Sequence, residues 1–536
     1  MTRRTWSWGL VGLVLLAAWL RLDGLLHLPL WLDESASWRD ASRGLLACVR
    51  WEQHRSHPPL SYILVGGVTR AVGTDAAWAL RLPSFVMSLV SVALAGVLGR
   101  KLYSPGLGLV VALLLAVDPL LVHQGMQARM YSLFVAAMLL SLLAARPLLV
   151  AGRGPLSRWL MLGLAMSLAV WSSGLFSVLL IGFALAGPWW WRRRRRETTE
   201  SASRAVDPAP GDGLGVARGA LVCVAVIVIT SHVGIVKYAD LALTKRSDRG
   251  AEETARSVEP TPTAVTRPTA TASASVSGPV SPPSGPWSDR ARGIVESLGG
   301  LVPLPAVGWV VAVIGGTGCI VLTLRGRRDH AVLAGVVVAN LVVLVGNTVL
   351  RDVVAVRYLV PYAVAMWFGW VGLLHAIEQP VWRRFGVVLL LAVAGLLAVD
   401  LDRRQRYVAN PAGHALGGKL AYVADVKGPD QSVRLMPASW AGLASYYDLA
   451  LTPPAEAEPE PTEWLIVALP LRRLEAYGET AHLRRWLEAN DREFDKATLA
   501  EIDRRVRSEG AAVLRRSGET VWADTPTIEP PGLWPW

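Results

Sequence analysis

Residues 82–99 read LPSFVMSLVSVALAGVLG, an apolar run without a single ionisable side chain. A helix of about 17–25 apolar residues crosses the hydrocarbon core of a bilayer, so this run predicts a transmembrane helix. About eleven such runs occur before residue 400, which predicts an α-helical multi-pass membrane protein. The other runs lie approximately at residues 6–22, 105–122, 131–146, 158–172, 175–191, 218–236, 302–324, 331–350, 358–376 and 385–400.

The composition of the 536-residue chain agrees with a membrane protein. Hydrophobic residues make up 52% and charged residues only 18%, whereas soluble chains carry about 25% charged residues. This composition excludes an ordinary water-soluble enzyme and a disordered chain. Three cysteines allow at most one disulfide, so no disulfide framework is expected.

The net charge of +12 is unevenly distributed along the chain. Basic residues stand at alternate turns between the predicted spans, and the strongest group is the arginine run 192–196 after three tryptophans. Because cytoplasmic turns collect Lys and Arg, the N-terminus is expected in the cytoplasm and the basic turns inside a plasma (inner) membrane. This orientation requires that the stretch 58–73 lie in the interface instead of crossing.

The same orientation places three long segments outside. The first outer loop covers 23–81, and a later loop contains a Pro-, Thr- and Ser-rich stretch at 245–290 that is expected to be disordered. The segment 401–536 is predicted to be a small extracytoplasmic α/β domain. Its expected strands lie at 432–436, 464–469 and 520–524, and its expected helices at 471–489 and 497–509.

The first outer loop contains the residues best suited to chemistry. Asp33 and Glu34 are adjacent acids just beyond the first span, and His57 precedes two prolines. A carboxylate at this position can serve as a general base for an acceptor hydroxyl, or it can bind a divalent cation together with His57. A solvated acidic turn is the alternative interpretation of the two acids, and a plain loop residue is the alternative for His57.

Four stretches in this order resemble a known family. Residues 31–38 (WLDESASW) with 57–62 (HPPLSY), 80–84 (LRLPS), 127–133 (QARMYSL) and 357–361 (RYLVP) are similar to motifs of the GT-C glycosyltransferases. The most similar branch is glycosyltransferase family 39, with the protein O-mannosyltransferases and the lipid A aminoarabinose transferases. The resemblance covers residues 1–400, which are expected to form the transmembrane catalytic domain.

This resemblance implies an inverting transfer of a sugar from a polyprenyl-phosphate carrier to an acceptor hydroxyl on a lipid, glycan or protein. Asp33 is then expected to be the catalytic base, assisted by Glu34. Substrate contacts are expected from His57, Arg81, Arg129, Tyr131, Arg357 and Tyr358, with the three arginines converging on the phosphate. A divalent cation is a possible cofactor, held by Asp33, Glu34 or His57, although Gln127 replaces an acid that relatives often carry.

Two other classes of function remain open from the sequence. A transporter is expected to carry ionisable residues within its spans or helices broken in repeated halves, and neither is evident. A non-catalytic membrane scaffold with an outer binding domain is the second alternative. The paired acids and the three arginines favour the enzyme, and no feature indicates a nucleic-acid partner.

Overall fold

The structure is a computed structural model that describes residues 1–50, 57–151, 154–187, 219–229, 308–351, 356–399, 411–426, 433–436, 464–467, 496–509 and 512–515, with single positions at 294, 298, 446, 483, 484 and 487. The arginine run 192–196, the stretch 245–290 and the expected elements at 471–489 and 520–524 lie largely or wholly outside these residues. Most of the described chain is helical, as the sequence predicted.

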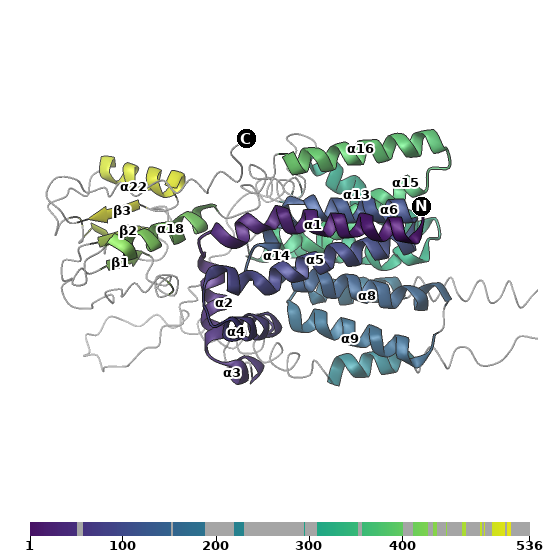
Figure 1. Ribbon diagram of the computed structural model, residues 1–536, viewed down its shortest axis with the longest axis horizontal. Helices are drawn as coiled ribbons and strands as arrows, with labels where there is room; N and C mark the ends of the chain where they lie inside the picture. Colours follow the sequence, from purple (N-terminus) through teal and green to yellow (C-terminus); the bar gives the residue numbers. More distant parts are fainter. Residues whose placement is uncertain are drawn as a thin grey trace, which may run out of the picture.

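A bundle of apolar helices forms the larger part of the molecule (Figure 1). Each predicted apolar run overlaps one helix, except 105–122, which the structure divides between two helices. The helices are α1 (Arg3–His27), α5 (Ala77–Leu102), α6 (Pro105–Val117), α7 (Pro119–Gly125), α8 (Tyr131–Ala151), α9 (Leu156–Ser172), Phe176–Gly187, Gly219–Ile229, α13 (Gly308–Leu324), α14 (Ala331–Arg351), α15 (Val360–His375) and α16 (Pro380–Val399).

Within the described residues, five helices are long and apolar enough to cross a membrane, and α6 with α7 makes a sixth if the bent pair is one span. The break between α6 and α7 bends the chain by 64°. The remaining apolar helices are shorter, so the expected number of about eleven spans stays a prediction. The fold class, a helical membrane protein, is confirmed.

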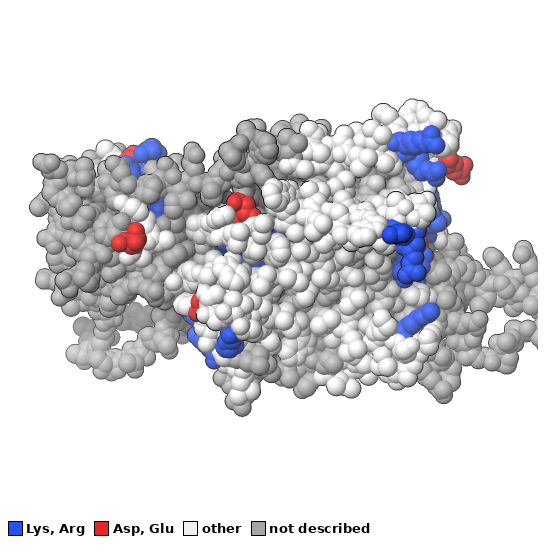
Figure 2. Space-filling model, viewed as in Figure 1, with Lys and Arg blue, Asp and Glu red and all other residues white. Residues whose placement is uncertain are grey.

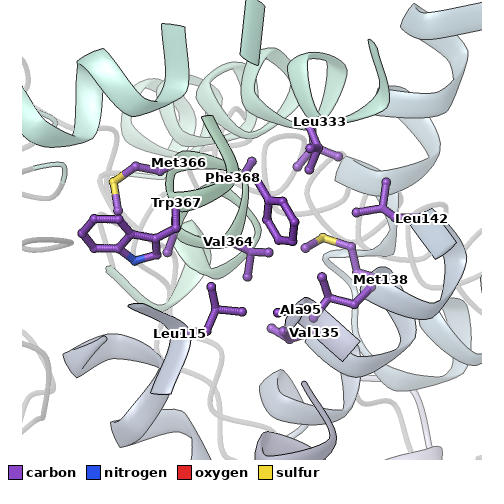
Figure 3. Packing of buried hydrophobic residues seen from close by; sticks show 14 of the residues in the cluster. Ala95, Leu115, Val135, Met138, Leu142, Leu333, Val364, Met366, Trp367 and Phe368 are labelled. Atoms are coloured by element: carbon purple, nitrogen blue, oxygen red, sulfur yellow. The ribbon is translucent and has the colours of Figure 1, made fainter. Parts of the chain in front are cut away.

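Helix α15 lies at the centre of the bundle. Trp367 and Phe368 are fully buried, and Figure 3 shows them among side chains from the surrounding helices, including Leu115 of α6 and Met138 of α8. The outer helices leave many apolar side chains exposed, such as those of α16. An apolar outer surface is stable in lipid and not in water, so the exposure pattern agrees with a membrane environment.

The basic side chains collect at one end of the bundle. Figure 2 shows Lys and Arg at the end where the N-terminus lies. There the guanidinium of Arg100, in the last turn of α5, lies 4.5 Å from the ring centroid of Trp6 in α1. Arg146 and Asp329 form an ion pair at 3.8 Å between α8 and the 3-10 turn η1 (Arg328–His330).

Two fully buried charged side chains lie within the predicted spans, where no ionisable residue was evident from the sequence. Arg21 of α1 and Asp118, between α6 and α7, are both fully buried. Arg21 donates to backbone carbonyls, and Asp118 accepts from the Leu121 N–H and from Trp367, so hydrogen bonds make their burial tolerable.

At the other end of the bundle lie α2 (Leu32–Ser42), α3 (Leu45–Arg50) and α4 (Leu60–Val72), all from the first outer loop (Figure 1). Helix α4 packs against α2 and α5, and it ends at Gly73 in the left-handed conformation. Glycine adopts that conformation without steric cost, so the chain turns directly into α5.

The C-terminal segment contains α18 (Pro411–Val426), α22 (Lys496–Glu509) and a sheet of β1 (Val433–Met436), β2 (Trp464–Val467) and β3 (Ala512–Arg515). Strand β2 is central, parallel to β1 and antiparallel to β3. Two predicted strands and the helix at 497–509 are thus confirmed, whereas β3 and α18 were not predicted. Tyr446 links this segment to the bundle, because its hydroxyl donates to the carbonyl of Asp75 at 3.2 Å.

Candidate functional site

Helix α2 presents Asp33 and Glu34 in opposite environments. Both acids stand in its first turn, where the helix dipole and the free backbone N–H groups favour negative charge. Successive helical residues point about 100° apart, so neighbouring side chains face different directions. Glu34 is fully buried, while the Asp33 side chain is 26% exposed. The structure therefore separates two acids that the sequence placed side by side.

Glu34 forms a buried ion pair with Arg81 of α5. The Nε and Nη2 atoms of Arg81 donate to the two carboxylate oxygens at 2.8 and 2.7 Å, and neither side chain is exposed. The backbone N–H of Ala128 also donates to Glu34 at 2.8 Å. Arg81 uses its other donors on the carbonyls of Gly24, Leu28 and Pro29. The pair thereby joins the end of α1, the start of α2, helix α5 and the turn before α8.

Asp33 is held by the other two predicted arginines. Nη1 of Arg357, in the 3-10 turn η2 (Val356–Leu359), donates to Asp33 Oδ2 at 2.7 Å. Arg129 approaches the same oxygen at 3.8 Å through Nη2, and its Nη1 donates to the Asp33 carbonyl at 3.0 Å. Residues from three distant parts of the chain therefore meet at one carboxylate.

The two arginines differ in exposure. Arg129 is buried, whereas Arg357 is 32% exposed and accessible from outside the protein. Burial acts to lower the pKa of Arg129, but the Asp33 carboxylate and the neighbouring Tyr131 more than offset it, so the pKa is raised above its usual value. Within the described residues, the Nε atoms of both arginines have no hydrogen-bond partner. Both unpaired Nε donors are themselves buried.

Aromatic rings surround this cationic group. The Arg357 guanidinium lies 5.6 Å from the centroid of the Tyr358 ring and 6.0 Å from that of Trp31. Both distances fall within the range of cation–π contacts. Tyr131 is buried and interacts electrostatically with Arg129. Tyr131 and Tyr358 therefore lie where the sequence placed them, and Trp31 joins them.

The remaining predicted residue, His57, is half-buried directly before α4, and its role stays a prediction. Gln127 is buried, and its amide nitrogen lies 2.8 Å from Nε2 of His123. Within the described parts of the chain, no three His, Cys, Asp or Glu side chains are grouped closely enough to hold a metal ion.

Sequence reasoning missed two serines that support the arginines. Ser37 Oγ donates to the Asp33 carbonyl at 3.2 Å and lies 3.5 Å from Nη1 of Arg129. Ser84 Oγ donates to the Arg129 carbonyl at 2.7 Å. A helical interpretation of residues 32–42 would have placed Ser37 on the same face as Asp33, because positions i and i+4 are neighbours.

Comparison of the structure with solved structures finds several similar chains. ArnT from Cupriavidus metallidurans matches in the apo state with a TM-score of 0.49 and 14% identity, covering 90% of this chain and 89% of that one. The same enzyme bound to undecaprenyl phosphate gives a TM-score of 0.48, with the same identity and coverage. The Archaeoglobus fulgidus oligosaccharyltransferase with Zn and sulfate gives 0.48 and 12% identity, covering 92% of this chain and 71% of that one.

Sequence comparison gives one family. A search of curated proteins found no match. The sequence profile of the dolichyl-phosphate-mannose–protein mannosyltransferases matches residues 56–201, which contain His57, Arg81, Arg129 and Tyr131. The resemblance to this branch of the GT-C glycosyltransferases, which the motifs of the chain indicated, is therefore confirmed.

Proposed function

We propose that the protein is a membrane glycosyltransferase that moves a sugar from a polyprenyl-phosphate carrier to an acceptor hydroxyl. The observation that carries this proposal is the arrangement around Asp33, a part-exposed carboxylate held between Arg129 and Arg357. Such a transfer needs a base and cations at neighbouring positions, and this arrangement supplies both. The family match over residues 56–201 supports the same reaction class.

Asp33 is the proposed catalytic base. Its carboxylate accepts the proton of the acceptor hydroxyl as the acceptor oxygen bonds to the anomeric carbon of the sugar. The bond between that carbon and the phosphate oxygen breaks, and the electron pair leaves with the polyprenyl phosphate. Direct attack opposite the leaving group inverts the anomeric centre, and we propose this stereochemical course for a hexosyl or pentosyl donor.

Arg129 and Arg357 are the proposed phosphate ligands. A guanidinium fork matches two phosphate oxygens and stays charged throughout the reaction. In the absence of donor, Arg357 is paired with Asp33 at 2.7 Å. A bound phosphate competes with that carboxylate for the guanidinium, which releases Asp33 to accept a proton. Donor binding and activation of the base are coupled in this scheme.

Arg81 and Glu34 have a different role in this proposal. Their side chains hydrogen-bond to each other and have no exposed surface, so a substrate cannot reach either of them. We assign them as positioning residues that hold α2 against α5 and the turn before α8. Glu34 thereby fixes the direction of Asp33, its neighbour in the chain.

The aromatic residues are proposed to bind the sugar. Trp31 and Tyr358 flank Arg357, and Tyr131 lies beside Arg129, so the three rings surround the proposed phosphate site. Aromatic faces pack well against the apolar faces of sugar rings, and phenol hydroxyls bond to sugar hydroxyls. His57 is retained as a further proposed substrate contact.

A divalent cation fits this group of residues poorly. Glu34 directs both carboxylate oxygens to Arg81, and Oδ2 of Asp33 is shared by two guanidinium groups. A metal ion there would meet the repulsion of neighbouring cations and only one available acid. The proposed mechanism therefore has no step through a metal.

We further propose that transfer takes place on the outer face of the plasma (inner) membrane. The basic end of the bundle, which carries the N-terminus, is the expected cytoplasmic end, and Asp33 lies at the opposite end. The proposed division of the chain is a transmembrane catalytic domain, 1–400, and an extracytoplasmic α/β domain, 401–536.

Turnover of a polyprenyl-phosphate sugar with a labelled sugar group, by purified protein in lipid, tests the proposal. Release of polyprenyl phosphate together with labelled acceptor is expected from the wild type and not from Asp33→Asn. A transporter would move the donor across the bilayer without cleaving it, and a scaffold would bind without turnover. Transport without cleavage, or binding without turnover, would overturn the proposed function if it is observed with every acceptor hydroxyl in a broad set.

A further inference from the structure

The break between α6 and α7 is built around Asp118, which no part of the proposed mechanism uses. Asp118 caps the N-terminus of α7 by accepting the Leu121 N–H at 2.9 Å, and Pro119 occupies the first position of that helix. Its other carboxylate oxygen accepts from Nε1 of Trp367, in central helix α15, at 2.7 Å. Asp118 is fully buried, so both contacts are shielded from solvent.

Arg21 completes the opposite side of the same break. The last carbonyls of α6 cannot find helical partners beyond the bend, partly because Pro119 has no N–H. Arg21 of α1 donates to two of these carbonyls, Ala116 at 3.0 Å and Leu115 at 3.5 Å. Asp118 is the acid whose charge acts on Arg21. Arg21 therefore satisfies carbonyls at the end of α6, and Asp118 satisfies an N–H group at the start of α7.

A small cavity lined by both polar and apolar side chains adjoins Arg21. Among the described residues, the Nε of Arg21 and the Oε1 of Gln124 have no hydrogen-bond partner, and both residues line this cavity with Ser88, Ser91 and Ser132. An ordered water in this cavity could accept from the Nε of Arg21 and donate to the Oε1 of Gln124. A Cβ on Gly125 would lie 2.8 Å from both Arg21 Nε and Ser88 Oγ, so the space tolerates no larger residue there.

A short, hydrogen-bonded segment connects the bend to the proposed active site. Helix α7 leads from Asp118 to Gly125, and Ser132 Oγ donates to the Gln124 carbonyl at 2.9 Å. The Met126 N–H donates to the His123 carbonyl at 3.1 Å, and three residues later comes Arg129. Arg21 stands 18 residues after the start of α1, about 27 Å along its axis, and hence toward the end that holds Asp33.

We infer that Arg21 and Asp118 act as a clamp on the bent span, and that this clamp, with a bridging water, sets the position of Arg129. Arg21 and Asp118 are therefore positioning residues of the proposed phosphate site and do not touch the donor themselves. This inference rests on the proposed function only for the role of Arg129. The clamp itself is a property of the bend and is measurable without any ligand.

The first measurement is amide hydrogen exchange of residues 119–130 in the full-length protein in lipid. Asp118→Leu and Arg21→Met are expected to speed exchange there by about tenfold or more, since each removes a helix-end partner. Asp118→Asn keeps one capping oxygen, so its effect should be smaller. Leu139→Ala, a buried apolar change in α8, is the matched control. Exchange in this segment no faster in the two clamp variants than in the control would overturn the inference.

The second measurement is the Kd for undecaprenyl phosphate, expressed per folded protein. Asp118→Leu should weaken binding about tenfold, and in an Arg129→Ala background it should weaken binding no further, because it acts through Arg129. Equal losses in both backgrounds would overturn the positioning role. If the wild type fails to bind while exchange still responds to the clamp variants, the proposed function is refuted and the clamp is supported.

Discussion

The sequence and the structure indicate different roles for Arg81, and substitution of this residue distinguishes between them. The sequence motif predicts a phosphate ligand. The structure gives Arg81 two hydrogen bonds to Glu34 and three to backbone carbonyls, all without exposed surface. If the structural role holds, Arg81→Leu should lower the free energy of unfolding instead of acting only on donor binding.

The expected loss is large. Removing one partner of a buried ion pair costs about 3–5 kcal/mol, because the remaining charge stays buried without compensation. The Ala128 N–H still donates to Glu34 in the variant, which lowers the expected cost. The carbonyls of Gly24, Leu28 and Pro29 lose their donor, which raises it. A domain is stable by only about 5–15 kcal/mol, so the variant should lose about a fifth or more of its stability.

A double-mutant cycle isolates the pair. Arg81→Leu, Glu34→Leu and the combined variant are unfolded with denaturant in mild detergent, and the signal is tryptophan fluorescence. The combined variant leaves no unpaired charge, so it should be at least about 2 kcal/mol more stable than the sum of the single effects predicts. Asp33→Leu is the matched control on the same helical turn. Its carboxylate is part-exposed, although buried Arg129 loses a partner, so it should cost less than either substitution in the Arg81–Glu34 pair.

Two results would refute the reasoning. One is an Arg81→Leu variant within about 1 kcal/mol of the wild type, which would mean that the buried pair contributes little. The other is strict additivity of the two single substitutions. A stable, fully folded Arg81→Leu protein that no longer binds undecaprenyl phosphate would restore Arg81 to the phosphate site.

Further predictions concern the site and the orientation. Asp33→Asn keeps the shape of the side chain but removes the base, so transfer should fall by about 10²–10⁴-fold at an unchanged folded fraction; near-normal turnover would reject Asp33 as the base. Arg357→Lys keeps the charge but loses the fork, so it should retain more activity than Arg357→Ala in the same assay, and equal losses would argue against bidentate binding. In a cysteine-free background, Ser42→Cys should react with an impermeant thiol reagent applied outside cells and Gln379→Cys should not; the reverse pattern would invert the proposed topology.

The membrane helices were predictable because hydropathy is a local property. The hydropathy of a window depends only on the residues inside it, and this is why helices were found at every predicted run, although the run 105–122 is divided between α6 and α7. The bend at Asp118 was not predictable in the same way. It depends on Arg21 and Trp367, which come from distant segments and satisfy the groups that the break exposes. Long-range pairing of this kind leaves little trace in a single sequence.

The C-terminal segment shows a different limit. Helix α18 contains several glycines, which have low helix propensity, and it was not predicted. Yet Leu416, Leu420 and Val423 are all fully buried and follow the i, i+4, i+7 spacing of one helical face. The apolar pattern was therefore present, and the burial of this face, with α22 packed against the helix, outweighs the cost of the glycines.

The adjacent acids show why a motif identifies a site more easily than the roles within it. Asp33 and Glu34 are consecutive in the chain and both carry a carboxylate, so the sequence predicts the same chemistry for both. Helix geometry directs the two side chains about 100° apart, and their different burial then determines the role of each. Glu34 meets Arg81 without exposure and becomes a fixed ion pair, while Asp33 keeps surface and shares its charge with two arginines. Reactivity requires a carboxylate that can exchange partners, and only the part-exposed Asp33 meets that requirement.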